Sequence, residues 1–130
     1  MSAAISRREA RRAAVFILFQ SDVTGQPLGS LYDGDVDAYT ERLAQAVSAH
    51  AEELDARITD AADDWTADRL GAVERNVLRV ALEELDEREV PVEVVLDEAV
   101  SLAKRYASED AAKLVNGILG RIVREDGRER

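Results

Sequence analysis

Four arginines stand close together near the start of the chain: Arg7, Arg8, Arg11 and Arg12. A guanidinium group gives a phosphate two parallel hydrogen bonds and can also stack on a nucleobase. On a helix, at about 100° per residue, these positions span an arc of roughly 140° beside an apolar face. We therefore expect the four side chains to face solvent together as a contact surface for RNA. An ordinary solvated helix face is the alternative interpretation, because basic helix faces are common.

A second polar set lies near the end of the chain. Asp110, Lys113 and Asn116 are three residues apart, so they share one stripe of a predicted helix beside its apolar face. Asparagine is a poor helix former in mid-helix, which favours a specific hydrogen bond to a base edge, a backbone group or a partner. The structural alternative is that Asn116 and Gly117 permit close helix packing and that Lys113 pairs with Asp110 or Glu109.

The sequence offers no catalytic or metal-binding motif. His50 is the only histidine and there is no cysteine, so imidazole and thiolate ligands cannot be assembled into a metal site. A glycine-rich phosphate loop and a nucleophile elbow are both absent. Carboxylates are so abundant that no pair of them is specific. We expect no enzyme activity, no cofactor and no metal, with His50 at the edge of the buried face.

Length and charge restrict the class of protein further. A chain of 130 residues is expected to form one domain with a real core. The net charge of −10 argues against coating nucleic acid through bulk charge, so any RNA contact must be local. The first residues lack the apolar core of a signal peptide, and no apolar run reaches the ~18 residues that a membrane span needs. We therefore expect a cytoplasmic protein with no membrane contact.

The arginine set falls on a helix expected over residues 7 to 23. Ser6 and Glu9 have the spacing of a capping box, in which the serine hydroxyl accepts from a free amide of the first turn. Apolar residues recur within this helix at three- and four-residue steps and form one face. Glycines and a proline between residues 25 and 34 predict a loop. Apolar residues recurring from about 35 to 58 then predict one long acidic helix.

Three further helices complete the prediction. One is expected over about residues 66 to 87 and one over about 94 to 107. The stretch from Val90 to Leu96 is β-branched and could pass for a strand, but the chain offers no partner strand, so we expect a linker that enters the second of these helices. Ser108 is the expected N-cap of the last helix, with acids in its first turn.

Three motifs follow one another in the second half of the chain: VERNVLRVALEEL from Val73, DEAVSLAKRYA from Asp97 and SEDAAKLVNGILGRIV from Ser108. Together with the arginine-rich start that leads to Phe19, their order resembles the bacterial NusB family of transcription antitermination factors. The likeness is close from about Asp64 to Val123, moderate from Arg7 to Phe19, and weak between them.

This resemblance implies a fold and a division of the chain. The fold is all-α, a compact bundle of about six or seven helices arranged as two small helical subdomains. The single NusB-like domain would span residues 1–130, with subdomains at about 5–62 and 63–124 and a charged tail at 125–130.

The resemblance also implies a non-catalytic function. The chain would pair with a small-subunit ribosomal protein, also called NusE, and hold the boxA element of nascent ribosomal RNA transcripts near RNA polymerase. The implied RNA-side residues, with Arg12 added from the helical arc, are Arg7, Arg8, Arg11, Arg12, Asp110, Lys113 and Asn116. The implied residues for the protein partner are Phe19, Glu74 and Arg79.

One departure from the family bears on affinity. Family members often have an aromatic residue where Leu114 stands, so this chain lacks one possible surface for base stacking. Together with the net charge of −10, this predicts weak RNA binding by the chain alone and tighter, salt-sensitive binding as a heterodimer.

Three alternatives stay open at this point. The chain could be a protein-binding helical adaptor without direct RNA contact. It could be the module that some ribosomal RNA methyltransferases carry, although 130 residues leave no room for a catalytic domain. It could also form a homodimer that buries the RNA surface.

Overall fold

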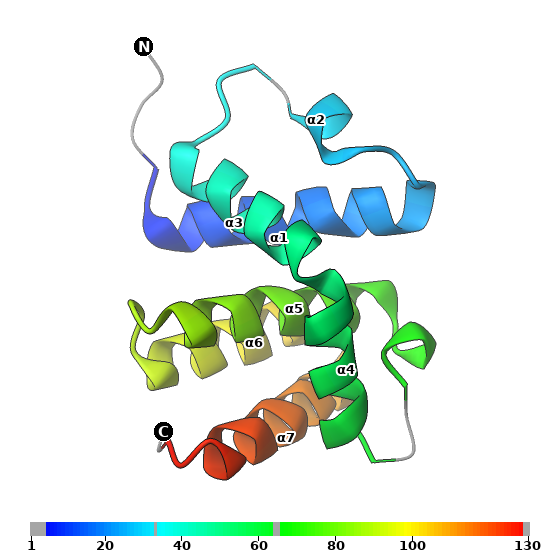
Figure 1. The fold of residues 1–130 in the computed structure, drawn as a ribbon, viewed down its shortest axis with the longest axis vertical. Coiled ribbons are helices and arrows are strands. Elements are labelled where there is room, and N and C mark those ends of the chain that lie inside the picture. Colours follow the sequence, from blue (N-terminus) through cyan, green and yellow to red (C-terminus); the bar gives the residue numbers. More distant parts are fainter. Residues whose placement is uncertain (1–4, 33, 64–65, 129–130) are drawn as a thin grey trace.

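Helices account for nearly all of the regular structure (Figure 1). The structure is a computed structural model and describes residues 5–32, 34–63 and 66–128. The helices are α1 (Arg7–Thr24), α2 (Leu28–Leu31), α3 (Ala38–Ala49), α4 (Ala51–Ala61), the 3₁₀ turn η1 (Ala67–Arg69), α5 (Ala72–Glu87), α6 (Val92–Tyr106) and α7 (Glu109–Glu125). Within the described ranges there are seven α-helices and no strand, so the predicted all-α class is confirmed.

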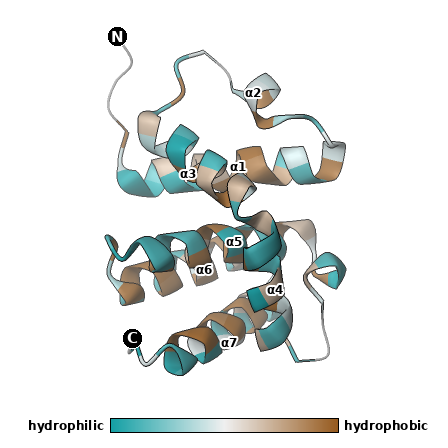
Figure 2. Ribbon diagram, viewed as in Figure 1, coloured by the Kyte–Doolittle hydropathy of each residue, from teal (hydrophilic) through white to brown (hydrophobic). Residues whose placement is uncertain are grey.

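Helix α5 lies at the centre of the molecule. It contacts α1, α3, α4, α6 and α7, and most of its side chains are buried. Figure 1 shows α1 and α3 above α5, α7 below it, α6 overlapping it, and α4 running from α3 down toward α7. Figure 2 shows apolar and hydrophilic residues alternating along the long helices, as expected when one stripe of each helix faces the core. One hydrophobic cluster includes residues from both sides of the proposed boundary near residue 62, and the division into subdomains stays a prediction.

The prediction of one long acidic helix over 35 to 58 is wrong. Two helices, α3 and α4, meet at His50, whose φ of −105° and ψ of 12° interrupt the helical backbone. The reason is tertiary packing: α3 packs mainly on α1, whereas α4 packs on α5, η1 and α7, so the chain must turn between them. Periodicity alone could not show this turn, because the apolar spacing continues through it.

Several other boundaries differ from the prediction. The helix expected from residue 66 begins only at Ala72, since Leu70 and Gly71 are extended and η1 precedes them. The loop between residues 25 and 34 contains the short helix α2. Helix α6 begins at Val92 rather than 94, directly after its N-cap Pro91, which excludes both the strand and the linker interpretations for most of that stretch.

The helix ends predicted from single residues are confirmed. The amide of Glu9 donates to the hydroxyl of Ser6 over 3.1 Å, and the amide of Ala111 donates to that of Ser108 over 3.0 Å. At its other end α1 stops at Gly25, whose φ of 75° is left-handed. Of the expected charged tail, residues 129–130 lie outside the described residues. No helix in the described ranges is long and apolar enough to cross a membrane.

His50 contacts Glu83 of α5 at the turn between α3 and α4. Its Nδ1 lies 2.7 Å from Oε1 of Glu83, and its side chain is half exposed. The hydrogen bond and the charge of Glu83 raise the pKa of His50 above its ordinary value of 6.5, and Glu53 and Asp86 add to this effect. Because the pKa is higher in the folded state, the resulting stabilisation is complete below the unfolded-state pKa and is lost as the pH rises through the folded-state pKa.

We therefore predict a pH-dependent effect of His50→Gln. The substitution should lower the free energy of unfolding at about pH 6 and have a much smaller effect at about pH 9. Urea unfolding of both proteins across this range measures the difference. A control, Glu83→Gln, should remove most of the same pH dependence, and a His50→Gln effect that is constant with pH would contradict the assignment.

Candidate functional site

Arg7 and Arg8 are exposed at the start of α1. The side chain of Arg8 is 60% exposed, and its Nε lies 3.0 Å from Oε2 of Glu98 on α6. The guanidinium carbon of Arg7 lies 4.4 Å from the centre of the Tyr39 ring, a cation–π contact. Both guanidinium groups are therefore positioned at the surface and able to reach a phosphate in solvent.

Arg11 faces the core, and the prediction that all four arginines face solvent together is wrong. Arg11 is 5% exposed. Its position is one turn before Ala14 and two turns before Leu18, so it shares their buried face of α1. The guanidinium donates through Nε to Oε1 of Glu84 and through Nη2 to Oε2 over 3.0 Å. Burial by itself lowers the pKa of Arg11, but the hydrogen bond and charge of Glu84 outweigh burial and raise it.

Glu84 of α5 joins three helices through one carboxylate. Besides the guanidinium of Arg11, it accepts a hydrogen bond of 2.5 Å from the hydroxyl of Tyr39 on α3. Burial, followed by the hydrogen bond to Glu84, raises the pKa of Tyr39, so its hydroxyl stays protonated and donates. Glu84 is 1% exposed, and a buried carboxylate is tolerated only when it is paired in this way.

Tyr39 was not singled out from the sequence. Its ring contacts two cations, since the guanidinium carbon of Arg42 lies 4.9 Å from the ring centre in addition to that of Arg7. Arg42 is itself held by Glu87, whose two carboxylate oxygens each accept a hydrogen bond of 3.0 Å. Tyr39 thus positions Arg7 at the surface. An aromatic residue three positions before an arginine on a predicted helix was the available signal.

Arg12 is partly exposed and connects α1 to α6. Its Nε donates to Oε1 of Glu98 over 2.9 Å, and 22% of its side chain is exposed. Glu98 is therefore shared by Arg8 and Arg12. Of the four predicted arginines, two are fully at the surface, one is partly so and one is internal.

The predicted stripe of Asp110, Lys113 and Asn116 is exposed on α7. The structural alternative for it is wrong on two counts. Among the described residues Lys113 forms no ion pair, and Glu109 lies 3.8 Å from Nζ of Lys104 instead. A Cβ added at Gly117 would meet no atom within 4 Å, so close packing does not require glycine there.

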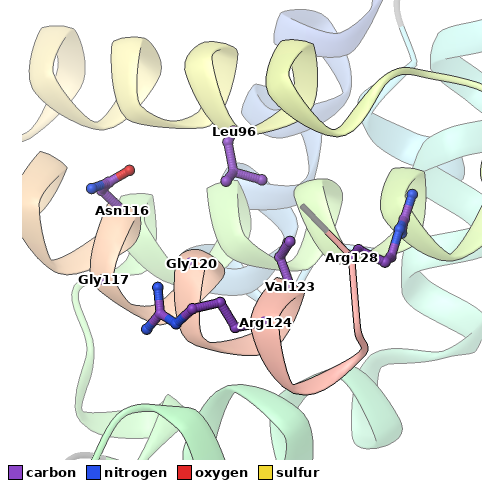
Figure 3. A pocket seen from close by; sticks show the side chains of 7 residues that line it. All are labelled: Leu96, Asn116, Gly117, Gly120, Val123, Arg124 and Arg128. Atoms are coloured by element: carbon purple, nitrogen blue, oxygen red, sulfur yellow. The ribbon is translucent and has the colours of Figure 1, made fainter. Parts of the chain in front are cut away.

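Helix α6 lies between the arginines and the α7 stripe. Glu98 faces α1, where it binds Arg8 and Arg12. Leu96, about 200° away around the helix, lines a cavity of about 400 Å³ together with Asn116 of α7 (Figure 3). The two polar sets predicted from the sequence therefore lie on either side of the same helix.

An apolar groove opens between α1, α5 and α6. The rings of Phe16 and Tyr106 meet edge to face, with centroids 4.8 Å apart, and these two residues are 38% and 40% exposed. The groove has a volume of about 180 Å³ and is lined by Val15, Phe16, Phe19, Val73, Val77, Leu102 and Tyr106. Exposed aromatic side chains around an apolar hollow are typical of a protein-binding surface.

Of the residues predicted to contact a protein partner, Phe19 lines this groove and Glu74 is the neighbour of its wall residue Val73. Phe16 was missed, although its position one turn before Phe19 was a usable signal. Both Phe19 and Glu74 are half-buried. These positions fit a surface that becomes covered on binding.

Arg79, also predicted to contact the partner, forms ion pairs within the protein. Its side chain is 15% exposed, and its Nη2 lies 2.6 Å from Oδ2 of Asp55 on α4. Asp22 at the end of α1 lies 3.5 Å from Nη1 of Arg79 and 2.8 Å from Nη2 of Arg75. The position of Arg79 therefore favours a role in holding α1, α4 and α5 together.

The arrangement is suited to binding. In the described part of the chain, no group of three or more histidines or carboxylates is placed to hold a metal ion. The surface groups of the two polar sets are guanidinium, ammonium, amide and carboxylate. Cations contact phosphates, while at base edges amides donate or accept hydrogen bonds and carboxylates accept them.

The chain is similar to proteins of one family. The sequence model of the NusB family matches residues 8–124. The transcription antitermination protein NusB of Rubrobacter xylanophilus is 43% identical over 122 residues, 88% of each chain. The solved NusB of T. maritima is 35% identical with a TM-score of 0.83, covering 95% of this chain and 94% of that one. A solved complex of the antitermination factors NusB and NusE with double-stranded RNA contains a chain 33% identical, with a TM-score of 0.81, covering 92% of this chain and 96% of that one.

We predict that removing one partner of the buried Arg11–Glu84 ion pair strongly destabilises the folded protein. Glu84→Leu should lower the free energy of unfolding by about 3–5 kcal/mol, because it leaves the charge of Arg11 buried and unpaired. The double variant Arg11→Met/Glu84→Leu should recover most of this loss, since no charge is then buried. Urea unfolding measures both, and a loss below about 1 kcal/mol in the single variant would show that Arg11 reaches solvent.

Proposed function

The chain belongs to the NusB family, and on that premise we propose that it is a transcription antitermination factor. It binds boxA-type RNA of nascent ribosomal RNA transcripts together with the small-subunit ribosomal protein NusE, within the antitermination complex of RNA polymerase. The similarity to a NusB chain solved with NusE and double-stranded RNA supports this assignment. The proposal rests above all on the exposure of Arg7 and Arg8 at the start of α1, on a chain whose net charge is −10.

The RNA contacts are divided between α1 and α7. Arg7 and Arg8 bind phosphates or stack on bases, and Arg12 contributes its exposed part. Arg11 supports this surface from beneath through Glu84. On α7, Lys113 binds a phosphate, while Asp110 and Asn116 form hydrogen bonds with base edges.

NusE occupies the apolar groove between α1, α5 and α6. Phe16, Phe19 and Tyr106 supply the aromatic contacts. Glu74, the residue after the groove residue Val73, supplies a charged contact. Aromatic side chains near the centre of an interface commonly account for most of its binding energy. Because α1 contributes to both surfaces, NusE and the RNA bind side by side on one helix.

The protein binds RNA and NusE and catalyses no reaction. It acts in the cytoplasm, where the transcripts are made. The groove alone would equally suit a protein-binding adaptor that makes no RNA contact. RNA-binding measurements with and without NusE distinguish the two functions.

The first prediction of this proposal concerns RNA. Fluorescence anisotropy of a short boxA RNA should show weak binding by the chain alone and tighter binding with NusE. Arg8→Ala should weaken binding by the complex and reduce the slope of log affinity against log salt by about 0.7, the value for one phosphate contact on a single strand.

A matched control is Arg69→Ala, because Arg69 is an exposed arginine of η1 outside both surfaces. This variant should bind RNA like the unchanged chain. Equal affinity with and without NusE would contradict the heterodimer proposal, and an absence of binding in both cases, with a folded protein, would favour the adaptor function.

The second prediction concerns the groove. Phe16→Asp places a charge among apolar side chains and should raise the Kd for NusE by at least about tenfold, as expected for the loss of a buried aromatic contact. The control is Val94→Asp, at a residue of α6 that is 42% exposed and does not line the groove. Isothermal titration calorimetry measures both, and an unchanged Kd for Phe16→Asp would place NusE elsewhere on the surface.

A further inference from the structure

Three hollows follow one another along the exposed side of α7, starting at the predicted RNA stripe. The first, of about 230 Å³, is lined by Lys104, Glu109, Ala112 and Lys113. The second, of about 330 Å³, again includes Lys113 and reaches Gly117 and Arg124. The third, of about 400 Å³, shares Gly117 and Arg124 with the second. Neighbouring hollows share lining residues, so the three adjoin one another, and we call this row of hollows the path.

The path is positively charged on an acidic protein. Its lining contains the five cations Lys104, Lys113, Arg121, Arg124 and Arg128, against the two acids Glu109 and Asp63. Arg121 is paired with Asp63 and Glu125. Within the described ranges, Lys113 and Arg124 have no carboxylate within ion-pair distance, so their charges remain available to a ligand. A local concentration of cations against a net charge of −10 attracts a polyanion to this path.

At Gly117 no side chain covers the backbone of α7 between the second and third hollows. Gly117 lies in the middle of a 17-residue helix, is exposed, and would meet no atom within 4 Å if it had a Cβ. Glycine weakens a helix interior, and neither packing nor a left-handed backbone requires it here. Gly117 lines both the second and the third hollow, and its lack of a side chain lets a ligand approach the helix closely.

The third hollow combines an apolar floor with polar groups at its edge (Figure 3). Leu96 and Val123 form the floor, and Asn116 lies at one end. The guanidinium of Arg124 lies over Gly120, where an added Cβ would come within 3.2 Å of Nη1. Arg128 donates to the carbonyl oxygen of Leu85 over 2.7 Å, which fixes its guanidinium while leaving other donors of the group for a ligand.

We propose that the RNA continues from Asp110 and Lys113 over α7 at Gly117 and that the third hollow binds one further nucleotide. The base lies on Leu96 and Val123 beside Asn116, and Arg124 binds the phosphate. The volume of about 400 Å³ is within the range of small-ligand sites. This inference rests on the proposed RNA-binding function and extends the RNA footprint toward the end of α7.

The test compares RNA lengths with the complex of the chain and NusE. Anisotropy is measured with a boxA core and with the same core extended by about four nucleotides at either end, a length near the smallest site of single-strand grooves. One of the extensions should tighten binding by at least about fivefold, the effect of stacking one base. Arg124→Ala and Gly117→Leu should abolish this gain and leave the affinity for the core unchanged.

Arg69→Ala is the matched control and should keep the gain. Thermal unfolding should show that Gly117→Leu does not lower the Tm, because the space around Gly117 is open. If the core binds but neither extension tightens binding, or if both variants keep the gain, the nucleotide site at α7 is rejected while the proposed function stands. If the core itself does not bind, the proposed function fails as well. An acidic peptide is titrated in parallel. If this peptide binds the path and neither RNA extension tightens binding, the ligand of the path is a protein.

Discussion

The buried ion pair between Arg11 and Glu84 determines how the N-terminal helix sits on the rest of the protein. Two charges with almost no exposure must satisfy each other, because an unpaired buried charge costs several kcal/mol. The carboxylate also accepts the hydroxyl of Tyr39, so one side chain of α5 fixes α1 and α3 together. Arg8 lies about 60° from Arg11 around α1, and Arg7, one turn before Arg11, is the first residue of the helix, so both stay exposed while Arg11 is buried. The arginines proposed to contact RNA therefore stand at the end of a helix that an internal ion pair holds in place.

The central position of α5 explains why the two candidate surfaces lie close together. At its start, Val73 and Val77 form a wall of the aromatic groove, and Arg75 and Arg79 hold the end of α1 through Asp22. Toward its end, Glu84 holds the beginning of α1. Helix α1 is thus fixed at both ends by polar contacts, and it presents cations near its start and aromatic rings further along. The groove proposed for the protein partner and the arginines proposed to contact RNA therefore lie on the same helix.

Much of the fold could be predicted from the sequence because it depends on local chemistry. The caps at Ser6 and Ser108 and the apolar stripe of α7 need only neighbours in the chain, and they were predicted correctly. The turn at His50 and the inward direction of Arg11 depend on residues far away in the sequence. Helical periodicity alone puts Arg11 on the same side of α1 as Leu18. Only the position of Glu84, which depends on the fold, shows that this buried face can accept a cation. For the same reason the contact of Tyr39 with Arg7 had no counterpart in a linear pattern, whereas its contact with Arg42 joins residues three positions apart on one helix.

The sharing of Glu98 by Arg8 and Arg12 has a consequence for the proposed contact of Arg8 with RNA. When Arg8 turns toward a phosphate, Arg12 remains at 2.9 Å from the carboxylate, so the nearly buried acid keeps a counter-ion. In the proposed contact, Arg8 exchanges a partly exposed ion pair with Glu98 for one with a phosphate, and exposed ion pairs contribute only about 0–1 kcal/mol. The contact can therefore form and be released without leaving Glu98 unpaired.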